Sequence, residues 1–166
     1  LLQQNGYQTA WIGKLHLGAL PHGFDYLNVL AGAGGQGTYF NPDFVNKNND
    51  TVGYKGYVTN LISDFFFDWV NNRDTSKPFF AVVGEKATHR SWQPDLQDLG
   101  AYDNIDFPLP ANFFDDYNTR LAAKDQDMTI DKTMRLKEDL KVGAKFGTDI
   151  TEEDINQSLK DLQKVY

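Results

Sequence analysis

The stretch Gly6-Tyr-Gln-Thr-Ala-Trp-Ile-Gly-Lys-Leu-His-Leu-Gly18 decides the fold of this chain. Residues 9–12 are a short apolar run rich in β-forming side chains, which predicts a buried strand that ends at Gly13. Lys14 and His16 would then lie on the loop at the carboxyl end of that strand, where open α/β sheets usually hold their ligands. Side chains two positions apart in an extended chain point the same way, so both would face one ligand. An ammonium group beside an imidazole suits binding of a tetrahedral oxyanion and proton transfer.

A helix and a second strand extend this pattern to an α/β fold. From residue 58 onward, apolar residues recur at steps of three and four and predict a helix with one buried stripe: Val58, Leu61, Ile62, Phe65, Phe66, Trp69 and Val70. Residues 78–84 form a continuous apolar run bounded by Pro and Gly, which predicts a strand covered on both faces. Helix followed by buried strand is typical of a parallel α/β unit. The intervening segment 18–57 is dominated by Gly, Asn, Pro and aromatic residues, which predicts a long irregular connection.

Composition limits the classes of function. The chain has 166 residues, 40% hydrophobic and 23% charged, as expected for one soluble globular domain over residues 1–166. A net charge of -7 argues against binding to nucleic acid, and no apolar run approaches the roughly 18 residues of a membrane span. The absence of cysteine excludes disulfides, thiolate metal sites and a cysteine nucleophile within the chain. We therefore expect neither nucleic acid nor a membrane as a partner.

The sequence of the first stretch is more specific than that of an ordinary glycine-rich turn. Gly6-Tyr7-x-Thr9, followed by Gly13-Lys14-x-His16-Leu17-Gly18, closely resembles the second signature of the type I sulfatases, which belong to the alkaline-phosphatase-like superfamily. Leu15 stands where that family usually has Trp, and both residues are apolar. The resemblance implies an α/β domain with a mainly parallel sheet flanked by helices. It also implies hydrolysis of a sulfate ester.

A second motif follows the other predicted strand. Glu85-Lys86-Ala-Thr-His89-Arg90-Ser-Trp92-Gln-Pro94 resembles the family's Lys-x-Pro-His-x-Pro/Trp-x-x-Pro motif, with Thr88 where Pro is common. The resemblance implies that Lys14 binds the sulfate and nucleophile oxygens, and that His16 hydrogen-bonds the nucleophile, a formylglycine hydrate. His89 would protonate the departing sugar oxygen. Lys86 and Arg90 are expected to bind substrate.

Two further stretches point to carbohydrate sulfatases. Gly35-Gln-Gly-Thr-Tyr-Phe-Asn-Pro-Asp-Phe44 resembles a segment of the glucosamine-6-sulfatase and mucin-desulfating enzymes, which implies substrate contacts by Gln36 and Asn41 and a sulfated carbohydrate as partner. Asn-Pro-Asp is also a common turn signal. Residues 109–117 resemble another family stretch. Their adjacent carboxylates, Asp115 and Asp116, predict a turn or a solvated face rather than a metal site, because no spaced ligands accompany them.

The resemblance covers residues 1–128 well and 129–166 weakly, so the chain is expected to be an internal fragment of a longer sulfatase. The family uses Ca²⁺ and a formylglycine made from Cys or Ser in a Cys/Ser-x-Pro-Ser/Ala-x-Arg context. The nearest match, Ser76-Lys-Pro78-Phe-Phe, lacks the Arg and the small residue. Ca²⁺ and formylglycine are therefore expected in the rest of the parent chain, and no cofactor is expected on this chain alone. The rest of the parent chain is itself an expected partner, beside the sulfated carbohydrate. The resemblance also implies a periplasmic, extracellular or lysosomal location.

Alternatives remain open at this level. A tetrahedral oxyanion site also suits a phosphate or phosphonate monoester hydrolase of the same superfamily. The polypeptide could instead be a noncatalytic carbohydrate-binding piece, with Trp11, Tyr39 and Trp92 as sugar-stacking surfaces. In the last third, Thr151 could cap a helix with the apolar stripe Ile155, Leu159, Leu162 and Tyr166.

Overall fold

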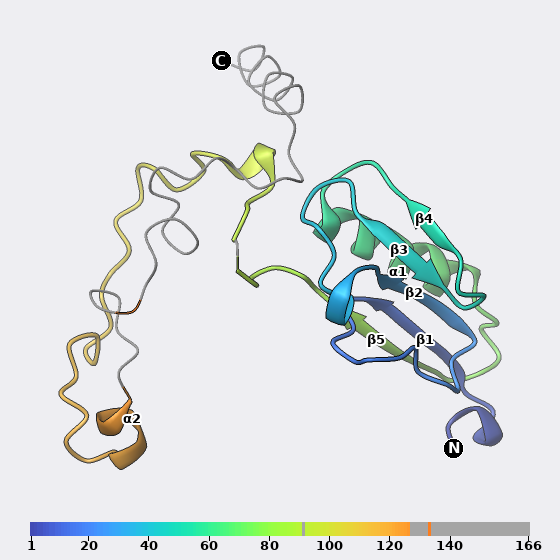
Figure 1. The fold of residues 1–166 in the computed structure, drawn as a ribbon, viewed down its shortest axis with the longest axis horizontal. Helices are drawn as coiled ribbons and strands as arrows, with labels where there is room; N and C mark the ends of the chain where they lie inside the picture. Colours follow the sequence, from blue (N-terminus) through green and yellow to red (C-terminus); the bar gives the residue numbers. More distant parts are fainter. Residues whose placement is uncertain (91, 127–132, 134–166) are drawn as a thin grey trace, which may run out of the picture.

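The computed structural model describes residues 1–90, 92–126 and 133. The helix predicted from Thr151 lies outside them. Five strands form one sheet in the order β4-β3-β2-β1-β5 (Figure 1). The strands are β1 (Gln8–Gly13), β2 (Tyr26–Leu30), β3 (Asp43–Asn46), β4 (Thr51–Gly53) and β5 (Phe79–Gly84). The helical elements are η1 (Gln3–Asn5), η2 (Ala33–Gly35), α1 (Val58–Asn72), η3 (Leu96–Asp98) and α2 (Leu121–Asp125).

The predicted α/β class is confirmed, and the sheet is parallel around β1. This strand pairs in parallel with β2 on one side and with β5 on the other, with Gly13 opposite Val29 and Gly84. The pairs β2–β3 and β3–β4 are antiparallel. Because β1 and β5 are parallel neighbours, the segments that follow them leave the sheet at the same edge. These segments carry the predicted site residues.

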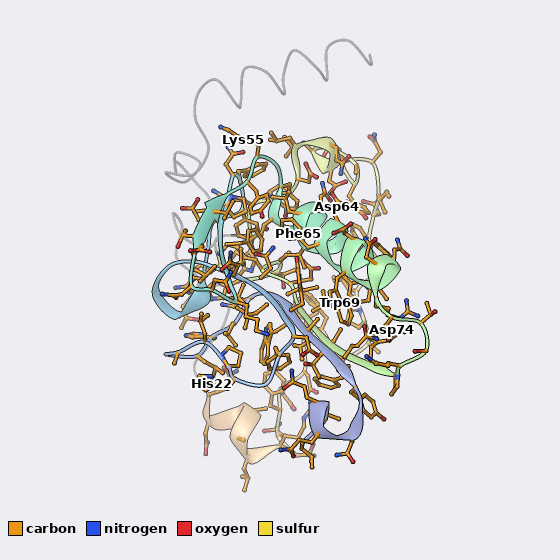
Figure 2. The ribbon with its side chains drawn as sticks, turned by 90° about the vertical axis from the view of Figure 1, so that its right-hand side faces the viewer. His22, Lys55, Asp64, Phe65, Trp69 and Asp74 are labelled. Atoms are coloured by element: carbon orange, nitrogen blue, oxygen red, sulfur yellow. The ribbon has the colours of Figure 1, made fainter. Side chains whose placement is uncertain are left out.

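Helix α1 covers one face of the sheet and completes the larger core. Val58 and Ile62 on the helix have no exposed surface, and neither do Ile12 of β1 and Phe44 of β3, which belong to the same cluster. Figure 2 shows Phe65 and Trp69 between the helix and the sheet, packed against this cluster. Burial of each large apolar side chain contributes on the order of 1.5–3 kcal/mol. The predicted stripe therefore holds α1 on the sheet.

The segment 18–57, predicted to be irregular, contains three strands. Before β2, the Asp25 carboxylate accepts hydrogen bonds from the N–H and hydroxyl of Thr9, at 2.9 and 3.1 Å. Strands β3 and β4 form a hairpin closed by Asn46, whose side-chain oxygen accepts from the N–H groups of Asn48 and Asp50 at 2.8 and 3.0 Å. The prediction was wrong because turn residues dominate the composition. The strands, of 5, 4 and 3 residues, are too short to show a clear period.

The apolar sequence of β5 predicts a strand that is covered on both faces. In the structure β5 lies instead at an edge of the described sheet, with part of its side-chain surface exposed. Phe79 and Phe80 are each 40% exposed and Val83 is 39% exposed. Within the described residues, β1 is the single strand that pairs with β5. A continuous apolar run is typical of an interior strand. The sequence of β5 thus carries an interior signal, while the described part of the fold supplies one neighbour.

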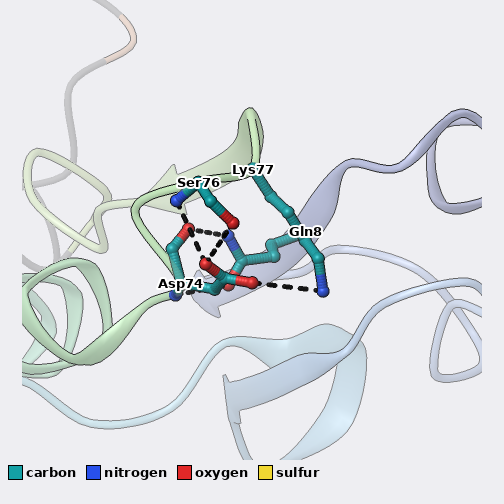
Figure 3. A network of polar contacts seen from close by, with 4 residues as sticks. All are labelled: Gln8, Asp74, Ser76 and Lys77. Atoms are coloured by element: carbon teal, nitrogen blue, oxygen red, sulfur yellow. Dashed lines mark hydrogen bonds and ion pairs between the residues drawn. The ribbon is translucent and has the colours of Figure 1, made fainter.

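A polar network ties the turn after α1 to the start of β1 (Figure 3). The Gln8 amide donates to the Asp74 carbonyl oxygen at 2.7 Å, and Gln8 Oε1 accepts from the Asp74 N–H at 2.9 Å. Asp74 Oδ1 accepts from the hydroxyl and N–H of Ser76 at 2.6 and 3.0 Å, and Lys77 Nζ lies 3.2 Å from Asp74 Oδ2. The hydrogen bonds from Ser76, followed by the contact with Lys77, lower the pKa of the Asp74 carboxyl. The network thus joins the turn before β5 to Gln8, the first residue of β1, which pairs with Phe79.

Beyond η3 the described chain runs away from the sheet (Figure 1), and its side chains are mostly exposed. Asp115 and Asp116 follow a turn at residues 111–114 there and lie outside regular secondary structure. Their carboxylates accept from backbone N–H groups two residues further on, at 2.8 and 3.0 Å, and Arg120 pairs with Asp115. No helix in the described ranges is both long and apolar enough to cross a bilayer.

Candidate active site

Two glycines let the ends of β1 and β5 approach closely. A Cβ on Gly13 would lie 2.1 Å from the Gly84 carbonyl oxygen, and a Cβ on Gly84 would lie 2.4 Å from the Lys14 carbonyl oxygen. Gly13 also has a φ of 90°, which glycine adopts without steric cost. The Lys14 N–H donates to the Gly84 carbonyl oxygen at 2.6 Å. The strand ends therefore hold Lys14 against the neighbouring strand.

The loop around η2 lies over the residues that follow β1. A Cβ on Gly35 would lie 2.0 Å from the Leu15 carbonyl oxygen, so only glycine fits there. This approach brings the side chain of Gln36 to both predicted residues. Lys14 Nζ donates to Gln36 Oε1 at 2.6 Å, and Gln36 Nε2 lies 3.3 Å from His16 Nδ1. One carboxamide thus joins Lys14 to His16.

Lys86, on the loop after β5, contacts the same residue. Its side chain is 6% exposed, and its Nζ donates to the Gln36 carbonyl oxygen at 2.9 Å. The Lys86 ammonium also lies 4.8 Å from the centroid of the Tyr39 ring, a cation–π distance. A buried ammonium is costly without such partners. Two positive charges, from Lys14 and Lys86, therefore meet the two oxygens of Gln36, and this concentration of charge favours an anionic ligand.

Hydrogen-bond chemistry assigns a proton to each histidine. An ammonium only donates, so Gln36 Oε1 faces Lys14 and the amide NH₂ faces His16. His16 Nδ1 is then the acceptor, and the neutral ring carries its proton on Nε2. A carbonyl only accepts, so His89 Nδ1, which lies 2.5 Å from the Arg90 carbonyl oxygen, carries a hydrogen. His16 thus offers an N–H donor, while His89 keeps Nε2 for proton transfer.

The predicted site residues differ in how closely they are connected. Lys14, His16, Gln36 and Lys86 form one hydrogen-bonded cluster, which we call the Gln36 cluster. His89 is exposed on the loop of Lys86, and its N–H donates to the Lys86 carbonyl oxygen at 2.8 Å.

Asn41 and Arg90 are less directly engaged with the cluster. Asn41 and Gln36 line one hollow, but Asn41 Oδ1 accepts from the Gly56 N–H at 3.0 Å. The Asn41 side chain thus joins its own segment to the segment that precedes α1. Arg90 is exposed, and its carbonyl oxygen orients His89.

Tyr39 has a place that the sequence did not reveal. It is 2% exposed, so the sugar-stacking role considered for it in the carbohydrate-binding alternative is wrong. Its hydroxyl donates to the His89 carbonyl oxygen, and its ring stacks on Tyr57 with centroids 6.1 Å apart. A tyrosine in a loop of Gly, Thr and Phe carries no signal of burial, because tertiary neighbours alone cover it. Tyr39 and Tyr57 are the contacts to the His89 loop that sequence reasoning missed.

The family follows from comparison with known proteins. A family model described as Sulfatase matches residues 1–154. The chain belongs to the sulfatase family. The N-acetylglucosamine-6-O-sulfatase of Bacteroides thetaiotaomicron is 48% identical over 143 residues, which cover 86% of this sulfatase chain and 25% of the relative. The N-acetylglucosamine-6-sulfatase of Capra hircus is 25% identical over 123 residues, which cover 65% of this chain and 21% of the relative.

A solved structure supports the same relationship. It holds a protein in complex with its substrate, D-glucosamine-2-N,6-O-disulfate, and matches with a TM-score of 0.74 at 42% identity. The match covers 96% of this sulfatase chain and 31% of that chain. The expected sulfatase fold is thereby confirmed. The chain spans about a quarter of the length of the curated relatives it matches.

Membership of the sulfatase family implies calcium and formylglycine in the whole enzyme. Residues 1–90, 92–126 and 133 contain no group of three or more His, Cys, Asp or Glu side chains that could hold a metal ion. The Gln36 cluster presents ammonium groups, which repel a cation, rather than the carboxylate oxygens that Ca²⁺ prefers. The described site therefore fits an anion and does not fit calcium.

Proposed function

We propose that the full-length protein containing this sulfatase chain hydrolyses a carbohydrate sulfate ester of the N-acetylglucosamine 6-sulfate type. The observation that carries the proposal is the convergence of Lys14, His16 and Lys86 on Gln36 at the carboxyl edge of the sheet. The names of the curated relatives and the sulfated glucosamine in the solved relative support the substrate class. The partners in this proposal are the sulfated sugar and the rest of the parent chain.

Lys14 and Lys86 would bind the sulfate oxygens of the substrate. The two ammonium groups come from the segments that follow neighbouring parallel strands, and one residue, Gln36, holds both in place, so little side-chain freedom remains to be lost when the anion binds. Hydrogen bonds between ionised partners are shorter and roughly twice as strong as neutral ones. The Nε2–H group of His16 would donate a hydrogen bond to a further oxygen at the reacting centre. Gln36 and, less directly, Asn41 and Arg90 would complete the substrate pocket.

His89 would act as the general acid. A sugar alkoxide is a poor leaving group, so a proton must reach its oxygen as the sulfur–oxygen bond breaks. The bond from His89 Nδ1–H to the Arg90 carbonyl oxygen keeps Nε2 available to carry that proton. A positioned acid of this kind typically contributes 10²–10⁴-fold to the rate.

We assign the formylglycine and the calcium ligands to parts of the parent outside this chain. The chain has no cysteine, and the Ser76 hydroxyl is bonded to Asp74 in the turn of Figure 3. No step of the reaction is assigned to either group. The isolated 166-residue chain is therefore expected to release no sulfate. We further propose a periplasmic, extracellular or lysosomal location, which fractionation of the source cells would test.

The test is sulfate release from N-acetylglucosamine 6-sulfate by the full-length enzyme, with N-acetylglucosamine 6-phosphate as competitor substrate. We expect His89→Ala to lower kcat about 100-fold or more and to change KM much less. His22, the remaining histidine of the chain, is exposed on another loop (Figure 2), and His22→Ala is the matched control. Equal rates for the two variants would remove His89 from the mechanism. Faster phosphate release would favour a phosphomonoesterase.

A further inference from the structure

We propose that Tyr39 and Tyr57 act together as a tyrosine clamp that positions the loop carrying His89. Tyr39 is then a positioning residue for proton transfer, acting through the backbone of His89. The inference rests on the proposed role of His89 as general acid. Neither tyrosine was expected to serve the site in this way.

Both tyrosine hydroxyls bond to the backbone of the His89 loop. Tyr39 donates to the carbonyl oxygen of His89 itself, and Tyr57 donates to the carbonyl oxygen of Gln93 at 2.8 Å. The two rings are stacked, with centroids 6.1 Å apart and planes 22° apart. The hydroxyls of one stacked pair of rings thus hold the loop at two points, His89 and Gln93.

Both tyrosines of the clamp contact the buried core. The carbonyl oxygen of Tyr39 accepts from the N–H of Val58, the fully buried first residue of α1, at 2.8 Å. Tyr57 precedes that helix directly and packs on Phe40, with ring centroids 5.2 Å apart. His89, in contrast, is exposed. The tyrosines therefore connect an exposed loop to the buried core of the fold.

The same clamp also contacts the anion-binding side of the site. The Tyr39 ring faces the ammonium of Lys86, which in turn bonds the carbonyl oxygen of Gln36. Tyr39 thus touches both Lys86 of the Gln36 cluster and the backbone of the proposed acid. A misplacement of a reacting group by about 1 Å can cost about 100-fold in rate. Loss of the Tyr39 hydroxyl should therefore affect turnover more than substrate binding.

The test is Tyr39→Phe in the full-length enzyme, which removes the hydroxyl but keeps the ring stack and the contact with Lys86. We expect kcat for N-acetylglucosamine 6-sulfate to fall about 10- to 100-fold, with KM changed less than about threefold. Tyr54→Phe is the matched control, because Tyr54 is a half-buried core tyrosine whose ring packs on Phe44 and Phe65. It should leave kcat unchanged.

A double-mutant cycle with His89→Ala separates positioning from a merely structural effect. If Tyr39 acts through His89, adding Tyr39→Phe to His89→Ala lowers kcat little further. An equal fractional loss in both backgrounds would overturn the inference while leaving the proposed function intact. A His89→Ala variant with wild-type kcat would overturn both. Should Tyr39→Phe fail to fold, Tyr57→Phe supplies the same cycle, with a smaller loss in the same direction.

Discussion

Substitution of Gly13 by alanine should destabilise the fold at the point where β1 and β5 meet. The added Cβ would lie 2.1 Å from the Gly84 carbonyl oxygen, a backbone atom that cannot move without disturbing the pairing of the strands. The residue must also keep a φ of 90°. The left-handed conformation costs about 1–2 kcal/mol. Overpacking costs about 1–3 kcal/mol. The expected loss of unfolding free energy is therefore about 2–5 kcal/mol.

Gly6→Ala is the matched control for this prediction. Gly6 has a similar φ of 82°, but a Cβ there would meet nothing within 4 Å. It should therefore cost only the conformational part, about 1–2 kcal/mol. Urea unfolding of the full-length protein, followed by tryptophan fluorescence, measures both losses. Because Lys14 directly follows Gly13, Gly13→Ala should also lower kcat/KM. Equal destabilisation by the two substitutions would refute the reasoning that the strand ends need a close approach.

Two further predictions concern Gln36 and Asp25. Gln36→Leu should lower kcat/KM about 10- to 100-fold, because Lys14 and His16 lose their shared partner. The lost charged hydrogen bond from Lys14 is by itself worth about 1.5–3 kcal/mol. Steady-state kinetics beside Gln97→Leu, at an exposed residue of η3, would check this. Burial alone would raise the pKa of Asp25, but bonds from Thr9 and Gln3 and the charge of Lys47 outweigh it and lower the pKa. A lowered folded-state pKa gives stability that is present above the unfolded value, near 3.8, and is lost as the pH falls through the folded value. The stability advantage of wild type over Asp25→Asn should therefore be seen in urea unfolding at pH 7 and shrink below pH 3.8; an advantage that grows in acid would contradict it.

Local patterns predicted the elements with strong periods. The three- and four-residue spacing from Val58 to Val70 predicted α1, and the apolar runs before Gly13 and Gly84 predicted β1 and β5. These signals are readable because a helix or strand must place its apolar side chains on one side to bury them. Strands β2, β3 and β4 were missed because they are short and lie among turn residues.

The candidate site was predicted in part for the same reason. The segments that follow β1 and β5 carry the four predicted residues Lys14, His16, Lys86 and His89, so parallel pairing of the two strands is enough to bring them to one edge of the sheet. The central place of Gln36 was not predictable from its position. It depends on how a glycine-rich loop folds back, with Gly35 against the carbonyl oxygen of Leu15.

The amino-acid sequence by itself determined the α/β class, the sulfatase family and the residue types proposed to bind an anion, because these depend on local periodicity and on the residues of short motifs. Tertiary structure alone decided that Gln36 joins Lys14 to His16, that the buried Tyr39 bonds to the His89 backbone, and that β5 pairs with β1 alone among the strands of the described residues. The physical reason is that hydrogen bonds and burial depend on which distant segments meet. The residues next to a position in the chain carry little information about which distant segments will contact it.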